Sequence, residues 1–226
     1  MVTLQFMGCP MHVLEYFTTY DRAFGHPLFS LVTTTCVSVE TALESGMLTT
    51  QAPTQLTFVT WNIDGLDQKN LKRRTRAVIE TLNNVGADIV FLQEVIPETF
   101  SYLESKLTNY DCYAAKQENY FVATLLRRGR VYYDKHKVID YPTTRMYRHL
   151  LAVRAHCGNV VMDLLNTHLE STTEHAQERM KQLEQCLDIM NRRPSNSTVI
   201  FAGKLNTGYP QNTFYTFNRM RHVQRT

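Results

Sequence analysis

The 226-residue sequence has few cysteines, no long apolar run and little net charge. Its five cysteines are scattered, odd in number and include no Cys-x-x-Cys pair. This argues against a disulfide framework or a zinc site and suits a reducing compartment. No apolar run reaches about 18 residues, so we expect no membrane span. Residues 1–30 lack a basic start followed by an apolar core, so we expect no secretory signal either.

The formal net charge of +3 is too small to indicate a nucleic-acid partner by itself. A chain of this length can hold one large domain, or one domain with an extension. In residues 1–54 neither a helical nor a strand period persists, so we interpret this part as a leader of unclear structure. Regular patterning extends from Leu56 to Asn206, and residues 207–226 read as a basic tail.

Two short apolar runs that end on polar side chains stand at the centre of the pattern. Leu56–Trp61 is followed by Asn62 and Asp64, and a second run, residues 88–92, is followed by Gln93 and Glu94. Helical spacing between the runs predicts strand–helix–strand, which brings Asn62 and Glu94 to neighbouring strand tips. Strand tips are favoured places for sites in α/β sheets, although buried strands that end in solvated polar groups give the same pattern.

The remaining pattern predicts a helix over residues 97–107 and consecutive strands over residues 111–115, 120–128, 130–140, 149–157, 159–167 and 198–203. Ser171-Thr-Thr-Glu174 has the spacing of a capping box and predicts the start of a further helix. Strands without intervening helices favour antiparallel pairing, whereas the first unit favours a parallel pair. A mixed sheet with helices outside, or two sheets packed face to face, satisfies both.

Seven short motifs carry a family resemblance: TWNIDGLD (60–67), FLQEVIP (91–97), ENYF (118–121), TTRMYRHLL (143–151), NTHLEST (166–172), HAQERMKQL (175–183) and TVIFAG (198–203). Their order and spacing resemble the endonuclease/exonuclease/phosphatase family over about residues 55–203. The resemblance implies an α/β fold, the four-layer αββα sandwich of DNase I-like proteins, incomplete at the C-terminus. Residues 55–206 would then be the N-terminal part of the family domain.

Within the family, the motifs are most similar to Mg²⁺-dependent phosphodiesterases of DNA repair, which hydrolyse 5′-phosphotyrosyl bonds between topoisomerase and DNA. The resemblance implies Mg²⁺ as cofactor, with Mn²⁺ as an alternative ion. It also implies DNA with a 5′-phosphotyrosyl end or a topoisomerase-derived peptide as partner, and the nucleus as location, with the cytoplasm as a second. Another nuclease or phosphatase of the superfamily, and a non-catalytic DNA- or protein-binding remnant, stay open as alternatives.

The resemblance also assigns roles to single residues. Glu94 matches the metal-binding carboxylate, and Mg²⁺ prefers such oxygen ligands. Asn62 and Asp64 match polar positions of the same network, and His168 and Ser171 match phosphate contacts. Without the resemblance, three of these residues have a plain structural interpretation: Glu94 as a solvated acid, His168 as a strand-end histidine and Ser171 as a helix cap.

Two further positions concern DNA. Tyr120 and Arg148 match the aromatic and basic residues that handle DNA in the related enzymes, since an aromatic face stacks on bases and arginine pairs with phosphate. The basic run of Lys72, Arg73, Arg74 and Arg76 on the first predicted helix reads more readily as a solvated face.

The pattern departs from the family after Gly203. The family continues Asp-x-Asn, whose aspartate acts on the attacking water, whereas this chain has Lys204-Leu205-Asn206. Asn206 can still align with the family asparagine. No Asp or Glu follows between Ile189 and Thr226, so this segment cannot complete a carboxylate metal site. We therefore expect impaired activity and weak metal binding.

Overall fold

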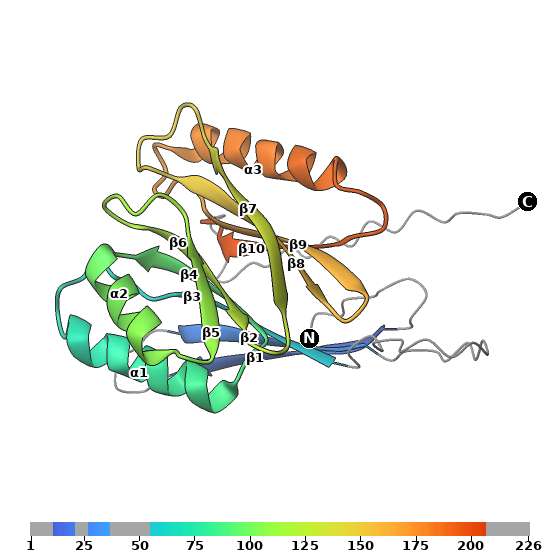
Figure 1. The fold of residues 1–226 in the computed structure, drawn as a ribbon. Helices are drawn as coiled ribbons and strands as arrows, with labels where there is room; N and C mark the ends of the chain where they lie inside the picture. The colour runs from blue at the N-terminus through green and yellow to red at the C-terminus, as the bar shows by residue number, and fades with distance from the viewer. Residues whose placement is uncertain (1–10, 21–26, 37–54, 207–226) are drawn as a thin grey trace, which may run out of the picture.

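The computed structural model describes residues 11–20, 27–36 and 55–206. Within these residues the strands form two sheets (Figure 1). The six-stranded sheet has the order β1 (Met11–Tyr20), β2 (Pro27–Cys36), β3 (Gln55–Asn62), β4 (Ile89–Val95), β6 (Phe121–Arg127) and β5 (Tyr110–Ala114). The four-stranded sheet has the order β10 (Thr198–Lys204), β9 (Val160–His168), β8 (His149–Cys157) and β7 (Tyr132–Asp140).

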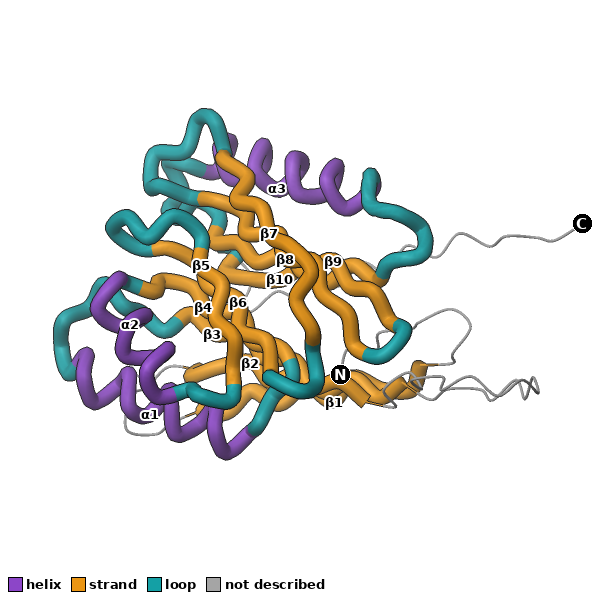
Figure 2. The backbone as a smooth tube through the Cα atoms, viewed as in Figure 1, coloured by secondary structure: helices purple, strands orange, loops and turns teal. Residues whose placement is uncertain are grey.

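Helices cover the outer faces of both sheets (Figure 2). Helices α1 (Leu71–Val85) and α2 (Pro97–Lys106) lie against the six-stranded sheet, and α3 (Ala176–Asn191) lies against the four-stranded sheet. The order of layers is therefore helix, sheet, sheet, helix. This confirms the predicted α/β four-layer sandwich and excludes the single mixed sheet.

Two parallel strand pairs set the polarity of the sheets. β3 pairs in parallel with β4 across α1, and β9 pairs in parallel with β10 across α3, while all other pairs are antiparallel. A parallel crossover returns the chain to the same edge, so the carboxyl ends within each pair are neighbours. Asn62 lies opposite Gln93 in one pair, and Lys204 lies opposite His168 in the other.

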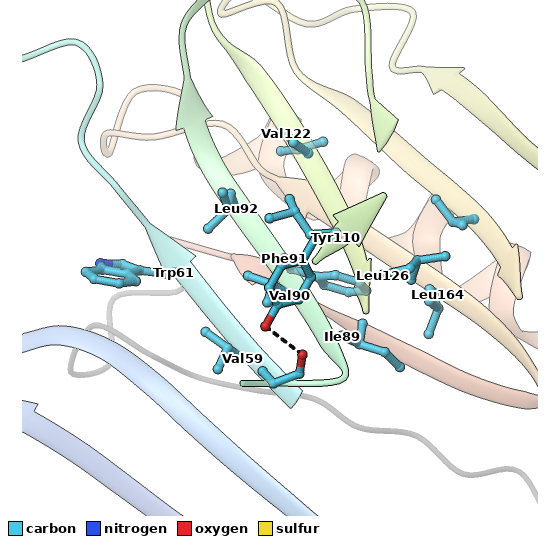
Figure 3. Packing of buried hydrophobic residues seen from close by; sticks show 14 of the residues in the cluster. Val59, Trp61, Ile89, Val90, Phe91, Leu92, Tyr110, Val122, Leu126 and Leu164 are labelled. Atoms are coloured by element: carbon cyan, nitrogen blue, oxygen red, sulfur yellow. Dashed lines mark hydrogen bonds between the residues drawn. The ribbon is translucent and has the colours of Figure 1, made fainter. Parts of the chain in front are cut away.

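The main core fills the space between the sheets and beneath α1 and α2 (Figure 3). Phe58, Phe91 and Leu126 of the first sheet belong to the same buried cluster as Leu164 of the second. β4 is buried almost throughout because both of its faces are covered, which explains its continuous apolar run. The hydroxyl of Tyr110 donates to the carbonyl of Ala87 at 2.8 Å, so this buried phenol is satisfied.

A buried pair of amides joins the two sheets. Gln93 of β4 donates from Nε2 to Oδ1 of Asn166 of β9 at 3.0 Å and to Oγ1 of Thr60 at 3.1 Å. Asn166 donates from Nδ2 to the carbonyl oxygens of Ala123 at 2.8 Å and Leu92 at 3.3 Å. Both amide side chains are almost fully buried. The bridge therefore links four strands of two sheets through one satisfied polar network.

The structure differs from the sequence analysis in the leader. β1 and β2 form an antiparallel pair, and β2 pairs with β3, so this part of the chain extends the six-stranded sheet. The predicted basic tail, residues 207–226, and the rest of the leader lie outside the described residues. No helix in the described part is long and apolar enough to cross a membrane.

The predicted capping box at Ser171–Glu174 was wrong. α3 begins at Ala176, its N-cap residue is His175, and no side chain caps it by a hydrogen bond. The hydroxyl of Ser171 instead accepts hydrogen bonds from Arg148 and Asn206. The segment before the helix is held by Arg179, which donates to the carbonyl oxygens of Glu170 and Thr172.

We predict that Asn166→Leu lowers the free energy of unfolding by about 1–3 kcal/mol, because it leaves the amide of Gln93 and two backbone carbonyls without this partner. The double variant Gln93→Leu/Asn166→Leu should cost less than the sum of the two single changes. Urea unfolding measures both, with Asn83→Leu on the exposed face of α1 as control. A cost for Asn166→Leu no greater than that of the control contradicts the role of the bridge.

Candidate active site

Three predicted or neighbouring site residues are the last residues of their strands: Asn62 of β3, His168 of β9 and Lys204 of β10. Glu94 is the next-to-last residue of β4. The side-chain amide of Asn62 donates to Oε1 of Glu94 at 2.7 Å, which confirms the predicted proximity of these two residues. The carboxyl ends of the parallel pairs thus gather the polar side chains at one edge of the sandwich.

The backbone of Glu94 adopts an unusual conformation. Its φ is +55°, in the left-handed region that non-glycine residues rarely occupy, and the pairing of β4 with β6 shifts register between Leu92 and Val95. Such irregularities redirect side chains next to functional sites. The N–H of Gly65 donates to the carbonyl of Glu94 at 3.0 Å, and a Cβ at Gly65 would collide with that carbonyl. The loop after β3 therefore holds Glu94 in place by close backbone contact.

Asp64 contributes through its backbone. Its N–H donates to Oδ1 of Asn62 at 2.9 Å, but its carboxylate is mostly exposed and forms an ion pair with Arg74 of α1 at 3.0 Å. Arg74 also lies 3.4 Å from a carboxylate oxygen of Asp67. The structure thus links Asp64 to the Asn62 amide, while its acid group is used to fasten the loop to α1.

The rest of the basic run lies apart from these groups. Lys72 and Arg76 line a separate cavity of about 610 Å³ between α1 and α2, with Leu71, Ile96 and Tyr102 among its other walls. This position agrees with the interpretation of the run as a face of α1 outside the site.

His168 comes from the second sheet to meet Glu94, with 3.9 Å between Nε2 and Oε1 of Glu94. Its Nδ1 lies 2.7 Å from a terminal nitrogen of Arg148. Because a guanidinium only donates, Nδ1 must accept this hydrogen bond, and a neutral imidazole then carries its proton on Nε2. The geometry therefore presents an N–H donor on the side of Glu94.

His168 is neutral because of its surroundings. Burial lowers the pKa of His168 well below its ordinary value, and the positive charges of Arg148 and Lys204 lower it further. The contact with Glu94 is consequently not an ion pair.

Arg148 is a buried cation held by neutral groups. Its guanidinium contacts His168, donates to Oγ of Ser171 at 3.1 Å, and lies over the Tyr120 ring at 5.0 Å. Its Nε has no hydrogen-bond partner within the described chain. Burial lowers the pKa of Arg148, against the opposing effects of Tyr120, Glu170 and Glu94. The hydroxyl of Tyr120 donates to the carbonyl of Met146 at 2.8 Å, which fixes the ring under the guanidinium.

Asn206 and Lys204, at and just after the end of β10, join the network of Glu94, His168, Arg148 and Ser171. The amide of Asn206 donates to Oγ of Ser171 at 3.0 Å and to the carbonyl of Leu169 at 2.8 Å. Lys204 is half-buried, and burial lowers its pKa while the negative charge of Glu94 acts in the opposite direction. Lys204, which the sequence analysis noted only as a departure from the family pattern, thus lies close enough to Glu94 to interact with it electrostatically.

The structure brings the predicted residues into one network, with Asp64 joined through its backbone alone. Connected through side chains or ring contacts are Asn62, Glu94, Tyr120, Arg148, His168, Ser171 and Asn206. Sequence reasoning missed the positioning role of Gln93 and Asn166. Their signal was an amide directly before Glu94 and another two residues before His168, each at the end of an apolar strand.

The carboxylate available for a metal ion is that of Glu94. Among the described residues no group of three His, Cys, Asp or Glu side chains converges on a common point. Mg²⁺ binds through as few as one or two carboxylates when waters and substrate phosphates supply its other ligands. The residues present therefore fit an ion held by one carboxylate.

A two-sheet sandwich with polar side chains gathered from both sheets at one edge defines the class, and the chain belongs to the Endonuclease/Exonuclease/phosphatase family, whose match covers residues 59–226. Divalent metal ions are in general use in this family.

Among curated relatives, tyrosyl-DNA phosphodiesterase 2 of Mus musculus is 40% identical over 183 residues, which is 76% of this chain and 50% of that protein. The Homo sapiens protein of the same name is 44% identical over 149 residues, 66% of this chain and 41% of that protein. The crystal structure of D. rerio TDP2 complexed with single strand DNA product matches with a TM-score of 0.66 and 37% identity, over 67% of this chain and 60% of that one. The chain spans about half the length of the curated relatives it matches.

We predict that stability falls as pH falls below about 6.5, because the unfolded chain then protonates a histidine that the folded chain keeps neutral. The contribution of His168 is fully present above the unfolded-state pKa and is lost at up to about 1.4 kcal/mol per pH unit below it. Urea unfolding in EDTA between about pH 7.5 and about pH 5.5 measures the slope. His168→Gln should flatten it, whereas His136→Gln on exposed β7 should leave it unchanged. Equal slopes for both variants would show that His168 is not the group responsible.

Proposed function

We propose that this chain is a phosphodiesterase that hydrolyses the bond between a tyrosine and the 5′-phosphate of DNA. The observation that carries the proposal is Arg148, a buried cation whose hydrogen-bond partners in the described chain are neutral. Glu170 and Glu94 act on Arg148 electrostatically but form no hydrogen bond with it, and its buried Nε has no partner in the described chain, so the guanidinium keeps donor capacity for an anionic ligand. The similarity to tyrosyl-DNA phosphodiesterase 2 supports a phosphate of a DNA end as that anion.

Different residues bind the phosphate and the nucleobase. The Nε2–H of His168 donates to a phosphate oxygen, and Arg148 supplies positive charge and orients His168 through Nδ1. Tyr120, which lies beneath Arg148, offers an aromatic face to a nucleobase near the scissile bond. Ser171 accepts hydrogen bonds from Arg148 and Asn206 and so holds both side chains beside the strand tips.

Glu94 is the residue that would hold the cofactor, which we propose to be Mg²⁺, with Mn²⁺ as an alternative. When bound, the ion neutralises charge on the phosphate and promotes attack by water. Asn62 keeps the Glu94 carboxylate in place through its 2.7 Å hydrogen bond. Lys204 stands where the family has an acid that acts on water, so we expect slow turnover.

We propose DNA carrying a 5′-phosphotyrosyl end, or a topoisomerase-derived peptide, as the partner, and DNA repair in the nucleus as the setting. A different nuclease or phosphatase of the same superfamily would act on abasic DNA or phosphoinositides in preference to this substrate. A non-catalytic remnant would bind DNA in a salt-sensitive way without turnover.

The test is release of tyrosine from a labelled 5′-phosphotyrosyl oligonucleotide in Mg²⁺. We expect slow hydrolysis that stops in EDTA and that Glu94→Gln lowers by at least about 10²-fold, because the single carboxylate for the ion is lost. Glu104→Gln on exposed α2 is the matched control and should retain the activity. Salt-sensitive DNA binding without turnover, or hydrolysis unaffected by Glu94→Gln, would contradict the proposed function.

A further inference from the structure

We propose that Lys204 binds the phosphate of a 5′-phosphorylated DNA end directly, so that the site recognises this phosphate without a divalent cation. The inference rests on the proposed function, because it concerns the same edge of the sandwich. It gives Lys204, at which the chain departs from the family pattern, a function in binding.

The backbone fixes where Lys204 lies. It ends β10 in parallel register with His168, and its carbonyl accepts a hydrogen bond from the N–H of Leu169 at 2.9 Å. The preceding Gly203 has a φ of +146°, and a Cβ at that position would collide with the backbone carbonyl of Thr167. β10 therefore packs tightly on β9, and the position of residue 204 beside the end of β9 is set by the main chain.

Lys204 is half-buried, and its side chain forms no ion pair or hydrogen bond within the described residues. Glu94 and His168 are its electrostatic neighbours, since Glu94 raises its pKa and Lys204 in turn lowers that of His168. No Asp or Glu occurs in residues 189–226. A partly desolvated cation in this position is stabilised by an anionic ligand.

The charges around this point complement a phosphate. Arg148 and Lys204 are positive, Glu94 and Glu170 are negative, and His168 is neutral. Glu170 is already held by hydrogen bonds from the hydroxyl of Thr144 and the N–H groups of Arg145 and Met146, so Lys204 is the cation that acts against Glu94. Glu94 alone would repel a phosphate, and in the family a metal ion offsets that repulsion. Here the ammonium of Lys204 offsets it, and lysine is a common point-charge partner of phosphate.

The test compares single-stranded oligonucleotides with and without a 5′-phosphate, by fluorescence anisotropy in EDTA. We expect the full chain to prefer the phosphorylated strand by about 10–100-fold, the range of a hydrogen bond to a charged group. Lys204→Met should remove most of this preference and Lys204→Arg should retain it, because the preference depends on the positive charge. Both variants should keep the urea unfolding transition of the unchanged chain, which distinguishes loss of binding from loss of folding. Lys181→Met on the exposed face of α3 is the matched control.

Two results overturn the inference. One is a preference for the phosphate that arises only when Mg²⁺ is added, and the other is a preference in EDTA that Lys204→Met leaves intact. Either result is compatible with Mg²⁺-dependent hydrolysis, so the proposed function would stand without Lys204. Equal binding of both strands with and without Mg²⁺, together with no turnover, would instead overturn the proposed function and the inference with it.

Discussion

The hydrogen bond between the buried amides of Gln93 and Asn166 is the contact on which the arrangement of the site depends. It joins β4 to β9 across the sandwich at 3.0 Å. Glu94 directly follows one amide and His168 lies two residues after the other, so the bridge sets the separation of these two strand tips. Apolar packing between sheets tolerates small shifts, whereas a buried amide pair must keep its geometry or lose its partners.

At this edge of the sandwich, burial and hydrogen bonds fix the protonation of His168 and the position of the Glu94 carboxylate. Burial lowers the pKa of His168 and so keeps it neutral, the charges of Arg148 and Lys204 add to this effect, and the hydrogen bond from Arg148 to Nδ1 directs the Nε2–H towards Glu94. The strained backbone of Glu94 and the hydrogen bond from Asn62 fix the single carboxylate opposite that donor. Binding a phosphate would give Arg148 an anionic hydrogen-bond partner, whereas in the described residues Glu94 and Glu170 act on it without a hydrogen bond.

The sequence predicts those parts of this structure that depend on local pattern. The apolar runs before Asn62 and Glu94 predict β3 and β4, and the helical spacing between them predicts α1, because one buried face determines each period. Pairings between distant segments carry no local signal, so the Gln93–Asn166 bridge and the strands β1 and β2 required the structure. The sequence also does not show which of several possible partners a side chain will bind. Ser171 has the spacing of a helix cap, yet its hydroxyl accepts hydrogen bonds from Arg148 and Asn206.

A crystal structure of the chain with a 5′-phosphorylated single strand of DNA tests the central claim, that the ends of β9 and β10 form a phosphate site beside Glu94 of the other sheet. The account predicts a phosphate within about 3 Å of the Nε2 of His168 and the Nζ of Lys204, the distance of charge-assisted hydrogen bonds. It also predicts that the buried amides of Gln93 and Asn166 stay paired. A phosphate bound elsewhere, such as at Lys72 and Arg76 in the cavity between α1 and α2, with the strand edge free of DNA, would contradict it.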